Sequence, residues 1–290
     1  MCGFSLNKMK VIYLIKDLQA ELSIRKSQNK KIGFVPTMGA LHEGHISLVE
    51  CSVKENDITV VSIFVNPTQF NDKNDLLNYP RALEADCRLL ADTGASYVFA
   101  PSAEEMYPQP DTRRFDYSPL DTVMEGAFRQ GHFNGVCQIV SKLFDAVQPH
   151  RAYFGEKDFQ QLAIIREMVR QLKYDIEIVG CPIVREKDGL AMSSRNTRLS
   201  ISGREYAWEI SQILFKSRAF AVDHSIDEVL QVVKDDIATV PSLRLEYFEI
   251  VNGDTLQKVR SWNEAFYVVG CIAVFCEEVR LIDNVKYREL

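Results

Sequence analysis

Short apolar runs alternate with longer segments of mixed apolar and polar residues over the first two-thirds of the chain. The runs have the unbroken Val and Ile content of strands buried on both faces, and the mixed segments have helical spacing. We expect strands at 32–35, 58–65, 97–100, 152–154 and 176–179. We expect helices at 43–56, 81–92, 136–146 and 159–171. This alternation predicts an α/β domain with a doubly wound, Rossmann-like parallel sheet covered by helices on both faces.

The pattern changes after about Pro182. Two helical segments come first, at 203–220 and 226–238. Three strand-like runs follow, at 244–251, 265–275 and 278–283. Helices followed by consecutive strands favour a smaller α+β domain. We therefore predict a Rossmann-like domain at 1–181 and a smaller α+β C-terminal domain at 182–290.

Composition narrows the class of protein. The chain has 290 residues, of which 46% are hydrophobic and 26% charged, as in an ordinary soluble globular protein. Its 34 Lys and Arg against 40 Asp and Glu give a net charge of −6, which disfavours general nucleic-acid binding. No apolar run reaches the ~18 residues of a membrane span. The protein is expected to bind neither nucleic acid nor a membrane.

The N-terminus and the cysteines bear on the location of the protein. The first residues, MCGFSLNKMK, contain no apolar core of a signal peptide. Met9 could be a second start, so residues 1–8 are expected to be an extension without function. Seven cysteines are scattered along the chain without a C-x-x-C pair. This fits a reducing cytoplasm better than a zinc ribbon or a secreted disulfide framework.

The segment PTMGALHEGH, residues 36–45, lies between the first expected strand and the helix that follows it. In a doubly wound sheet this is the carboxyl end of a strand, where ligands bind. Gly39 and Gly44 allow a ligand to approach the backbone, and the helix N-terminus favours phosphate. His42 and His45 could donate hydrogen bonds to phosphate oxygens. A capped helix with two surface histidines is the simpler alternative.

Three better-known motifs do not fit this segment. Gly39 and Gly44 have the spacing of a P-loop, but His45 stands where lysine is required. The sequence has no G-x-G-x-x-G. His42 and His45 are one residue closer than the histidines of H-E-x-x-H, so they would not share its i, i+4 geometry. The segment therefore favours phosphate binding over dinucleotide or zinc chemistry.

Three further polar segments carry candidate ligands. Asn66 and Gln69 follow the second long strand, and amides suit the hydroxyl and carboxylate groups of a small polar substrate. Lys157 follows the 152–154 strand in GEKDFQQ, and Arg195 lies in the polar loop AMSSRN. Both cations suit phosphate. A turn, a helix cap and a surface loop are the simpler alternatives for the three segments.

Together the segments resemble a known enzyme family. VPTMGALHEGH, FVNPTQF, GHFNGV, FGEKDFQQ and GLAMSSRN occur in the order and spacing of the pantoate–β-alanine ligases (pantothenate synthetases), within the HIGH/KMSKS nucleotidyltransferase superfamily. The resemblance covers the chain from Met9 onward. It implies that ATP and (R)-pantoate form pantoyl adenylate and pyrophosphate, after which β-alanine displaces AMP to give pantothenate, a precursor of coenzyme A. ATP is then a substrate, and Mg²⁺ is held mainly through the nucleotide phosphates.

The resemblance also implies a homodimer, and it assigns roles to single residues. His45 corresponds to the family's catalytic residue. Pantoate contacts fall on Gln69 and Gln161, and Gln69 also contacts β-alanine. No protein metal ligand is assigned, although Asp86 is an acidic candidate near Mg²⁺. The ATP contacts correspond to Met38, Gly39, Ala40, Leu41, His42, Glu43, Gly44, His45, Gly155, Glu156, Lys157, Asp158, Val184, Met192, Ser193, Ser194 and Arg195. The first domain would bind nucleotide and pantoate, and the second would act as a lid.

The implied chemistry agrees with these residue types. A carboxylate attacks the α-phosphorus in line, so the protein has to position the reactants and neutralise charge. No nucleophilic Ser or Cys is required, and G-x-S-x-G is absent. Three other functions stay open: a nucleotidyltransferase that forms no amide, a nucleotide-binding regulator without turnover, and a metal-dependent hydrolase that uses His42 and His45.

Overall fold

The chain divides into two compact units. The structure, a computed structural model, describes residues 9–70, 76–77 and 79–289, so the N-terminal extension expected at 1–8 lies outside the described residues. Unit 1 comprises the described residues up to Asp116 together with Arg129–Gly155 and Ile165–Cys181. Unit 2 comprises Tyr117–Phe128, Glu156–Ile164 and the described residues from Pro182 onward.

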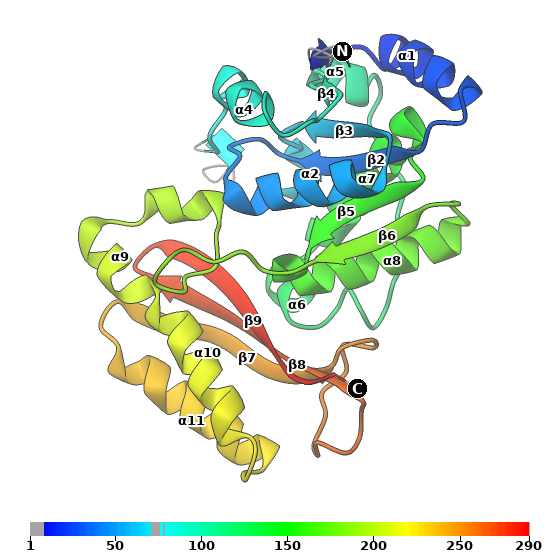
Figure 1. The fold of residues 1–290 in the computed structure, drawn as a ribbon. Helices are drawn as coiled ribbons and strands as arrows, with labels where there is room; N and C mark the ends of the chain where they lie inside the picture. The colour runs from blue at the N-terminus through cyan, green and yellow to red at the C-terminus, as the bar shows by residue number, and fades with distance from the viewer. Residues whose placement is uncertain (1–8, 71–75, 78, 290) are drawn as a thin grey trace, which may run out of the picture. The chain divides into compact units, whose positions relative to one another are not determined.

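Unit 1 is built on a six-stranded parallel sheet (Figure 1). Its strands are β1 (Lys10–Ile12), β2 (Ile32–Thr37), β3 (Ile58–Ile63), β4 (Tyr97–Phe99), β5 (Arg151–Gly155) and β6 (Glu177–Cys181). They lie in the order β1-β4-β3-β2-β5-β6. Phe34 of β2 is in register with Val60 of β3 on one side and with Ala152 of β5 on the other. The sheet therefore winds in opposite directions from β2, and the predicted doubly wound sheet is confirmed.

Helices cover both faces of this sheet. The helices of unit 1 are α1 (Ile15–Ser27), α2 (Glu43–Glu55), α4 (Leu83–Leu90), α5 (Ala103–Met106), α7 (His132–Val147) and the second part of α8 (Phe159–Leu172). Phe34 meets Phe144 of α7 edge-on, with ring centroids 6.3 Å apart. The next residue, Val35, shares a core with Leu48 and Val49 of α2. Because neighbouring strand residues point to opposite faces, α7 and α2 cover opposite faces.

Unit 2 has an antiparallel sheet of three strands, β7 (Leu243–Asn252), β8 (Tyr267–Cys276) and β9 (Val279–Glu289) (Figure 1). Its helices are α6 (Glu125–Phe128), the first part of α8, α9 (Ile201–Ala207), α10 (Glu209–Phe220) and α11 (Ile226–Thr239). Leu214 of α10 and Val233 of α11 share one buried core with Val274 of β8. The predicted smaller α+β domain is confirmed.

Several boundaries differ from the sequence expectations. The single helix expected at 203–220 is wrong, because the structure has α9 and α10, which meet at Trp208. β9 extends beyond the expected 278–283, since its pairing with β8 continues to Glu289. Strand β1 and helix α1 were not expected. The segments 117–128 and 156–164, which the sequence placed in the first domain, belong to unit 2.

Three kinds of feature are absent from the part of the chain that the structure describes. Within residues 9–70, 76–77 and 79–289, no helix has both the length and the apolar character needed to cross a bilayer. The six described cysteines are free thiols rather than disulfides: Cys51, Cys87, Cys137, Cys181, Cys271 and Cys276. No group of three or more His, Cys, Asp or Glu side chains among the described residues is arranged to hold a metal ion.

Asp111 ties the segment between α5 and α7 to the body of unit 1. Arg113 Nη2 donates to Asp111 Oδ2 at 2.6 Å, and the Asp111 side chain is only 4% exposed. Gln138 of α7 donates through Nε2 to the carbonyls of Asp111 and Arg113, both at 3.0 Å. The hydrogen bond from Arg113 lowers the pKa of Asp111 to about 2.

We predict that Asp111→Asn lowers the free energy of unfolding by about 1–2 kcal/mol at pH 7. The folded-state pKa lies below the unfolded value of about 3.9, so the stabilisation is complete above that value and is lost as the pH falls through about 2. Denaturant unfolding from pH 7 to pH 2 measures this, with the exposed Asp175→Asn as control. A difference between wild type and variant that stayed constant with pH would contradict the prediction.

Candidate active site

The loop between β2 and α2 has an unusual backbone that its sequence permits. Gly39 and Ala40 both have left-handed backbone conformations, with φ of +80° and +51°. A Cβ atom on Gly39 would lie 2.9 Å from Asp86 Oδ2 and 3.0 Å from Ile63 Cγ2. Only glycine therefore fits at this position without a shift of its neighbours. The loop emerges from the carboxyl end of β2, as expected from the sequence.

The carboxylate of Asp86, on α4, accepts hydrogen bonds from the backbone of this loop. Its side chain is buried, with 2% exposure of the residue. Oδ2 accepts a hydrogen bond from the amide of Ala40 at 3.1 Å, and Oδ1 accepts one from Leu41 at 2.8 Å. Burial raises the pKa of Asp86, although the two backbone hydrogen bonds oppose this shift. Both oxygens thus have protein partners, so Asp86 positions the loop rather than offering itself as a metal ligand.

His42 and His45 form the N-terminus of α2. His42 is the N-cap, and its Nδ1 accepts a hydrogen bond from the amide of Gly44 at 3.2 Å. His45 Nδ1 accepts one from the amide of His42 at 3.3 Å, and the ring centroids are 4.1 Å apart. Because Nδ1 is an acceptor in both rings, the proton of each neutral imidazole lies on Nε2. The helix therefore begins with two Nε2–H donors, where its dipole favours an anion.

Gln69 is fixed beside the same loop by three neighbours. Its Oε1 accepts a hydrogen bond from Asn66 Nδ2 at 3.2 Å, and its Nε2 donates to Met38 Sδ at 2.9 Å. His132 Nδ1 donates to the Gln69 carbonyl at 2.9 Å. Gln69 ends the short 3₁₀ helix η1 (Pro67–Gln69). The GHFNGV motif, which contains His132, thus supports the backbone of FVNPTQF.

Asn66 was expected to present its amide to a substrate, but the structure uses this amide within the protein. The residue is 1% exposed. Its Nδ2 donates to the carbonyl of Gly135 at 3.1 Å as well as to Gln69, and its Oδ1 accepts from Tyr107 at 2.8 Å. A Cβ atom on Gly135 would lie 2.4 Å from the Thr68 carbonyl, so α7 can approach this turn only at glycine. Asn66 therefore orients Gln69.

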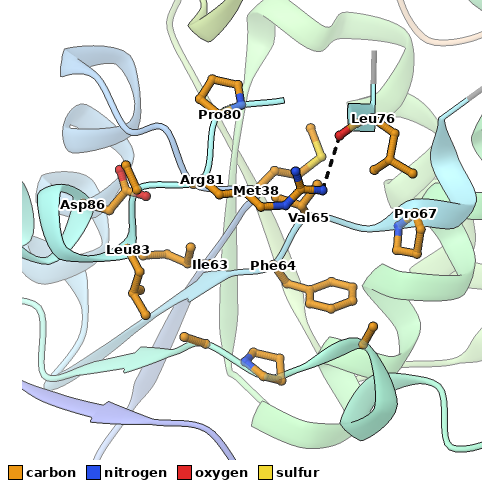
Figure 2. Close-up of a pocket in the computed structure, with 15 residues that line it drawn as sticks. Met38, Ile63, Phe64, Val65, Pro67, Leu76, Pro80, Arg81, Leu83 and Asp86 are labelled. Carbon is orange, nitrogen blue, oxygen red and sulfur yellow. Dashed lines mark hydrogen bonds between the residues drawn. The ribbon is translucent and has the colours of Figure 1, made fainter. Parts of the chain in front are cut away.

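A pocket of about 410 Å³ opens beside the loop in unit 1 (Figure 2). Among the described residues that line it, Asp86 and Arg81 are charged, and Arg81 Nη2 donates to the Leu76 carbonyl at 3.3 Å. The other labelled residues are apolar: Met38, Ile63, Phe64, Val65, Pro67, Leu76, Pro80 and Leu83. The pocket could therefore enclose a small ligand with a hydrocarbon portion.

Unit 2 brings together the other assigned segments. The 3₁₀ helix η2 (Glu156–Asp158) carries Lys157, whose Nζ lies 3.3 Å from Asp158 Oδ2. Loss of hydration opposes ionisation of Asp158, but the charges of Lys157 and Arg195 outweigh it and lower the pKa of this carboxyl. Arg195 lies on the 3₁₀ helix η3 (Ser194–Arg198), which contacts β9, as η2 does. The amide of Met192 donates to the Val184 carbonyl at 3.0 Å, which pairs the two sides of the loop 184–195.

Gln161 is half-buried on the first turn of α8, next to a residue that the sequence did not single out. Gln160 is 4% exposed, and its Oε1 accepts a hydrogen bond from the amide of Glu125 at 2.9 Å. Its Nε2 donates to the carbonyls of Leu120 and Val123 at 2.7 and 2.8 Å. Gln160 thus joins the segment 117–128 to α8. The motif GEKDFQQ contains both glutamines and does not show which of them is buried.

The assigned residues are distributed over both units. Unit 1 contains Met38, Gly39, Ala40, Leu41, His42, Glu43, Gly44, His45, Gln69 and Gly155. Unit 2 contains Glu156, Lys157, Asp158, Gln161, Val184, Met192, Ser193, Ser194 and Arg195. Within each unit the segments meet as described above.

Residues 10–286 match the sequence model of one family, described as pantoate-beta-alanine ligase. The chain belongs to the pantoate–β-alanine ligase family. Similar family members include the pantothenate synthetase of Bacteroides fragilis, which is 74% identical over 281 residues, covering 97% of this chain and 100% of the relative. The pantothenate synthetase of Phocaeicola vulgatus is 68% identical with the same coverage.

Solved structures of this ligase family are similar to the chain as well. The pantothenate synthetase of Thermus thermophilus has a TM-score of 0.91 and 44% identity, and the match covers 97% of this chain and 100% of that one. The pantoate-beta-alanine ligase of Francisella tularensis has a TM-score of 0.79 and 36% identity, and the match covers 96% and 98% of the two chains. The latter is complexed with beta-gamma ATP and beta-alanine.

We predict that Asp86→Asn loosens the loop after β2. The amide keeps one acceptor but turns an NH₂ group toward the second backbone N–H, so one buried donor loses its partner. We expect the free energy of unfolding to fall by about 1–3 kcal/mol and hydrogen exchange at Ala40 and Leu41 to accelerate. The control is Asp92→Asn, at an exposed position two residues after the end of α4. Unchanged exchange at the two amides would show that Asp86 does not hold the loop.

Proposed function

We propose that the chain catalyses the ATP-dependent condensation of (R)-pantoate with β-alanine to pantothenate, through pantoyl adenylate. The observation that carries this proposal is the pair His42 and His45, whose Nε2–H donors stand at the N-terminus of α2 in a member of this ligase family. The F. tularensis ligase is complexed with beta-gamma ATP and beta-alanine, which supports both as substrates here.

In the first step a carboxylate oxygen of pantoate attacks the α-phosphorus of ATP, and pyrophosphate leaves. Negative charge grows on the phosphates, and the donors of His42 and His45 stabilise it. Lys157 and Arg195 supply further positive charge. The other ATP contacts fall on the residues assigned from the family resemblance, and the segment 189–196 of unit 2 acts as a lid that closes over the phosphates. We assign the catalytic role to His45.

In the second step the amine of β-alanine attacks the acyl carbon of pantoyl adenylate. The new C–N bond replaces the bond to AMP, and the amine loses a proton. The side chains of Gln69 and Gln161 bind pantoate, and Gln69 also contacts β-alanine. Gln69 is well placed for this role because Asn66 and Met38 fix its amide beside the pocket. The apolar lining of that pocket, which includes Met38 and Phe64, suits the dimethyl carbon of pantoate.

Mg²⁺ is proposed to arrive with the nucleotide and to be held mainly through its phosphates. No cluster of His, Cys, Asp or Glu within the described ranges is suited to a metal ion, and both oxygens of Asp86 have backbone partners. When bound, the ion neutralises phosphate charge. We further propose a homodimer, as in the family resemblance, and a cytoplasmic location, which the free thiols favour. Sedimentation of the purified chain tests the dimer.

Two half-reaction measurements test the proposed function. Pyrophosphate must be released from ATP only when pantoate is present, and AMP must appear only when β-alanine is added. Release of pyrophosphate without pantoate would favour a different nucleotidyltransferase. Binding of ATP without any turnover would favour a regulatory protein.

We predict that His45→Ala slows adenylate formation by about 10²–10³-fold while ATP affinity changes little. The lost donor acts most strongly on the charge that develops during phosphoryl transfer. Rapid-quench kinetics measures the first half-reaction, and His224→Ala removes a histidine outside the assigned set as control. A near-normal first half-reaction in His45→Ala would refute the catalytic assignment.

We predict that Gln69→Ala and Gln161→Ala each weaken pantoate binding by about 10-fold or more, because a buried polar group of the substrate loses its partner. ATP affinity should change little. Isothermal titration with each ligand separately measures both affinities, and Gln171→Ala on the exposed side of α8 is the control. Loss of ATP affinity with intact pantoate binding would remove both glutamines from the pantoate site.

A further inference from the structure

Two consecutive residues of β9 are polar and buried in unit 2. Asp283 is 4% exposed and Asn284 is 5% exposed, and neither belongs to the assigned binding residues. Both lie in the centre of β9, opposite Ile272 and Cys271 of β8. Buried polar groups are costly unless they are hydrogen-bonded, so their partners indicate their role. As neighbours on a strand, the two side chains point to opposite faces of the sheet.

Asn284 holds η2. Its Nδ2 donates to the carbonyl of Glu156 at 2.8 Å and to that of Lys157 at 3.2 Å. These two bonds use both N–H groups of the amide. Lys286, on the same face of β9, places its Nζ 3.3 Å from a carboxylate oxygen of Glu156. The backbone that carries Lys157 is therefore attached to the sheet at two successive carbonyls.

The carboxylate of Asp283 is paired with Arg185 of the loop 184–195, which also contains Val184 and Arg195. Arg185 binds it in a two-pronged ion pair, with Nη1 at 2.6 Å from Oδ2 and Nη2 at 2.9 Å from Oδ1. Arg185 Nη1 also donates to the Gly189 carbonyl at 3.1 Å, and its backbone forms an antiparallel bridge with Ala191. The ion pair thus closes the turn that places Val184 next to Met192.

We propose that Asp283 and Asn284 are positioning residues of the nucleotide site, which set η2 and the 184–195 loop in a fixed relation through one strand. The inference rests on the proposed function, because it takes both segments to bind ATP. Neither β9 side chain needs to touch the nucleotide. A strand paired along its length is more rigid than a loop, so it can preorganise cations such as Lys157 and Arg195.

Asn284→Asp is the sharpest test because it keeps the shape of the side chain and removes both donors. A carboxylate would also face the two carbonyl oxygens. We expect KM for ATP to rise about 10-fold or more and the rate of adenylate formation to fall, because the backbone of η2 loses its attachment. KM for pantoate and KM for β-alanine should stay within about 2-fold of wild type.

Two control variants separate positioning from general stability. Asn252→Asp makes the same chemical change in the same sheet, but Asn252 Oδ1 is an acceptor from the amides of Asp254 and Thr255, and a carboxylate can replace it. Glu246→Gln weakens a half-buried ion pair with Arg280 on β9, whose Nε donates to Glu246 at 2.9 Å. Glu246→Gln should lower the thermal midpoint without raising KM for ATP.

The kinetic outcomes distinguish a positioning role of Asn284 from a purely structural role. A rise in KM for ATP alone, found in Asn284→Asp and absent from both controls, supports the inference. Wild-type ATP kinetics in Asn284→Asp, or an equal change for all three substrates as expected from a merely structural role, overturns it. If Asn284→Asp does not fold, Asn284→Ser, which retains one donor, carries the same test.

A direct titration of ATP makes failure of the inference distinguishable from failure of the proposed function. If wild type binds ATP but releases no pyrophosphate with pantoate, the proposed reaction is wrong, and the ratio of ATP affinities between wild type and Asn284→Asp still decides the inference. If wild type turns over and both proteins bind ATP equally, the reaction stands and the positioning role is wrong.

Discussion

The parallel pairing of β2 with β5 is the constraint on which the arrangement of unit 1 depends. From β2 the sheet continues through β3 and β4 in one direction and through β5 and β6 in the other. At such a reversal the connections of the two strands leave toward opposite faces, which opens a crevice at their carboxyl ends. The loop between β2 and α2, which carries His42, follows β2, and the chain that becomes η2 follows β5 at Gly155. The loop after β2 and the chain that leads into η2 therefore begin at neighbouring strand ends.

Buried polar side chains on regular elements then fix the conformation of these segments. In unit 1, Asp86 of α4 binds two successive amides of the loop between β2 and α2. In unit 2, Asn284 of β9 binds two successive carbonyls of η2. These hydrogen bonds fix the backbone of each segment in addition to any core packing, such as that of Leu41 in the loop after β2. Because the chain belongs to the pantoate–β-alanine ligase family, we propose that these hydrogen bonds position the two segments for ATP.

The fold class could be predicted because strands of a parallel sheet are buried on both faces and therefore appear as continuous Val and Ile runs. The five predicted strands, β2 to β6, and the helices predicted between them lie near their expected positions. The short edge strand β1 has no such run, and it forms because β4 offers a free edge to pair with. The break at Trp208 between α9 and α10 also has no marker in the hydrophobic pattern.

The sequence by itself determined the order of β2 to β6 and of the helices between them, and it located the polar segments that follow β2, β3 and β5, since both depend on local periodicity and motif spacing. Only the tertiary structure decided which polar groups are used within the protein. The sequence predicts Asn66 as a substrate ligand, whereas in the structure its amide is buried and bound to Tyr107, Gly135 and Gln69. Asp86, Gln160, Asp283 and Asn284 have partners far away in the sequence. Such partners are set by how the elements pack, and no local pattern of residues records that.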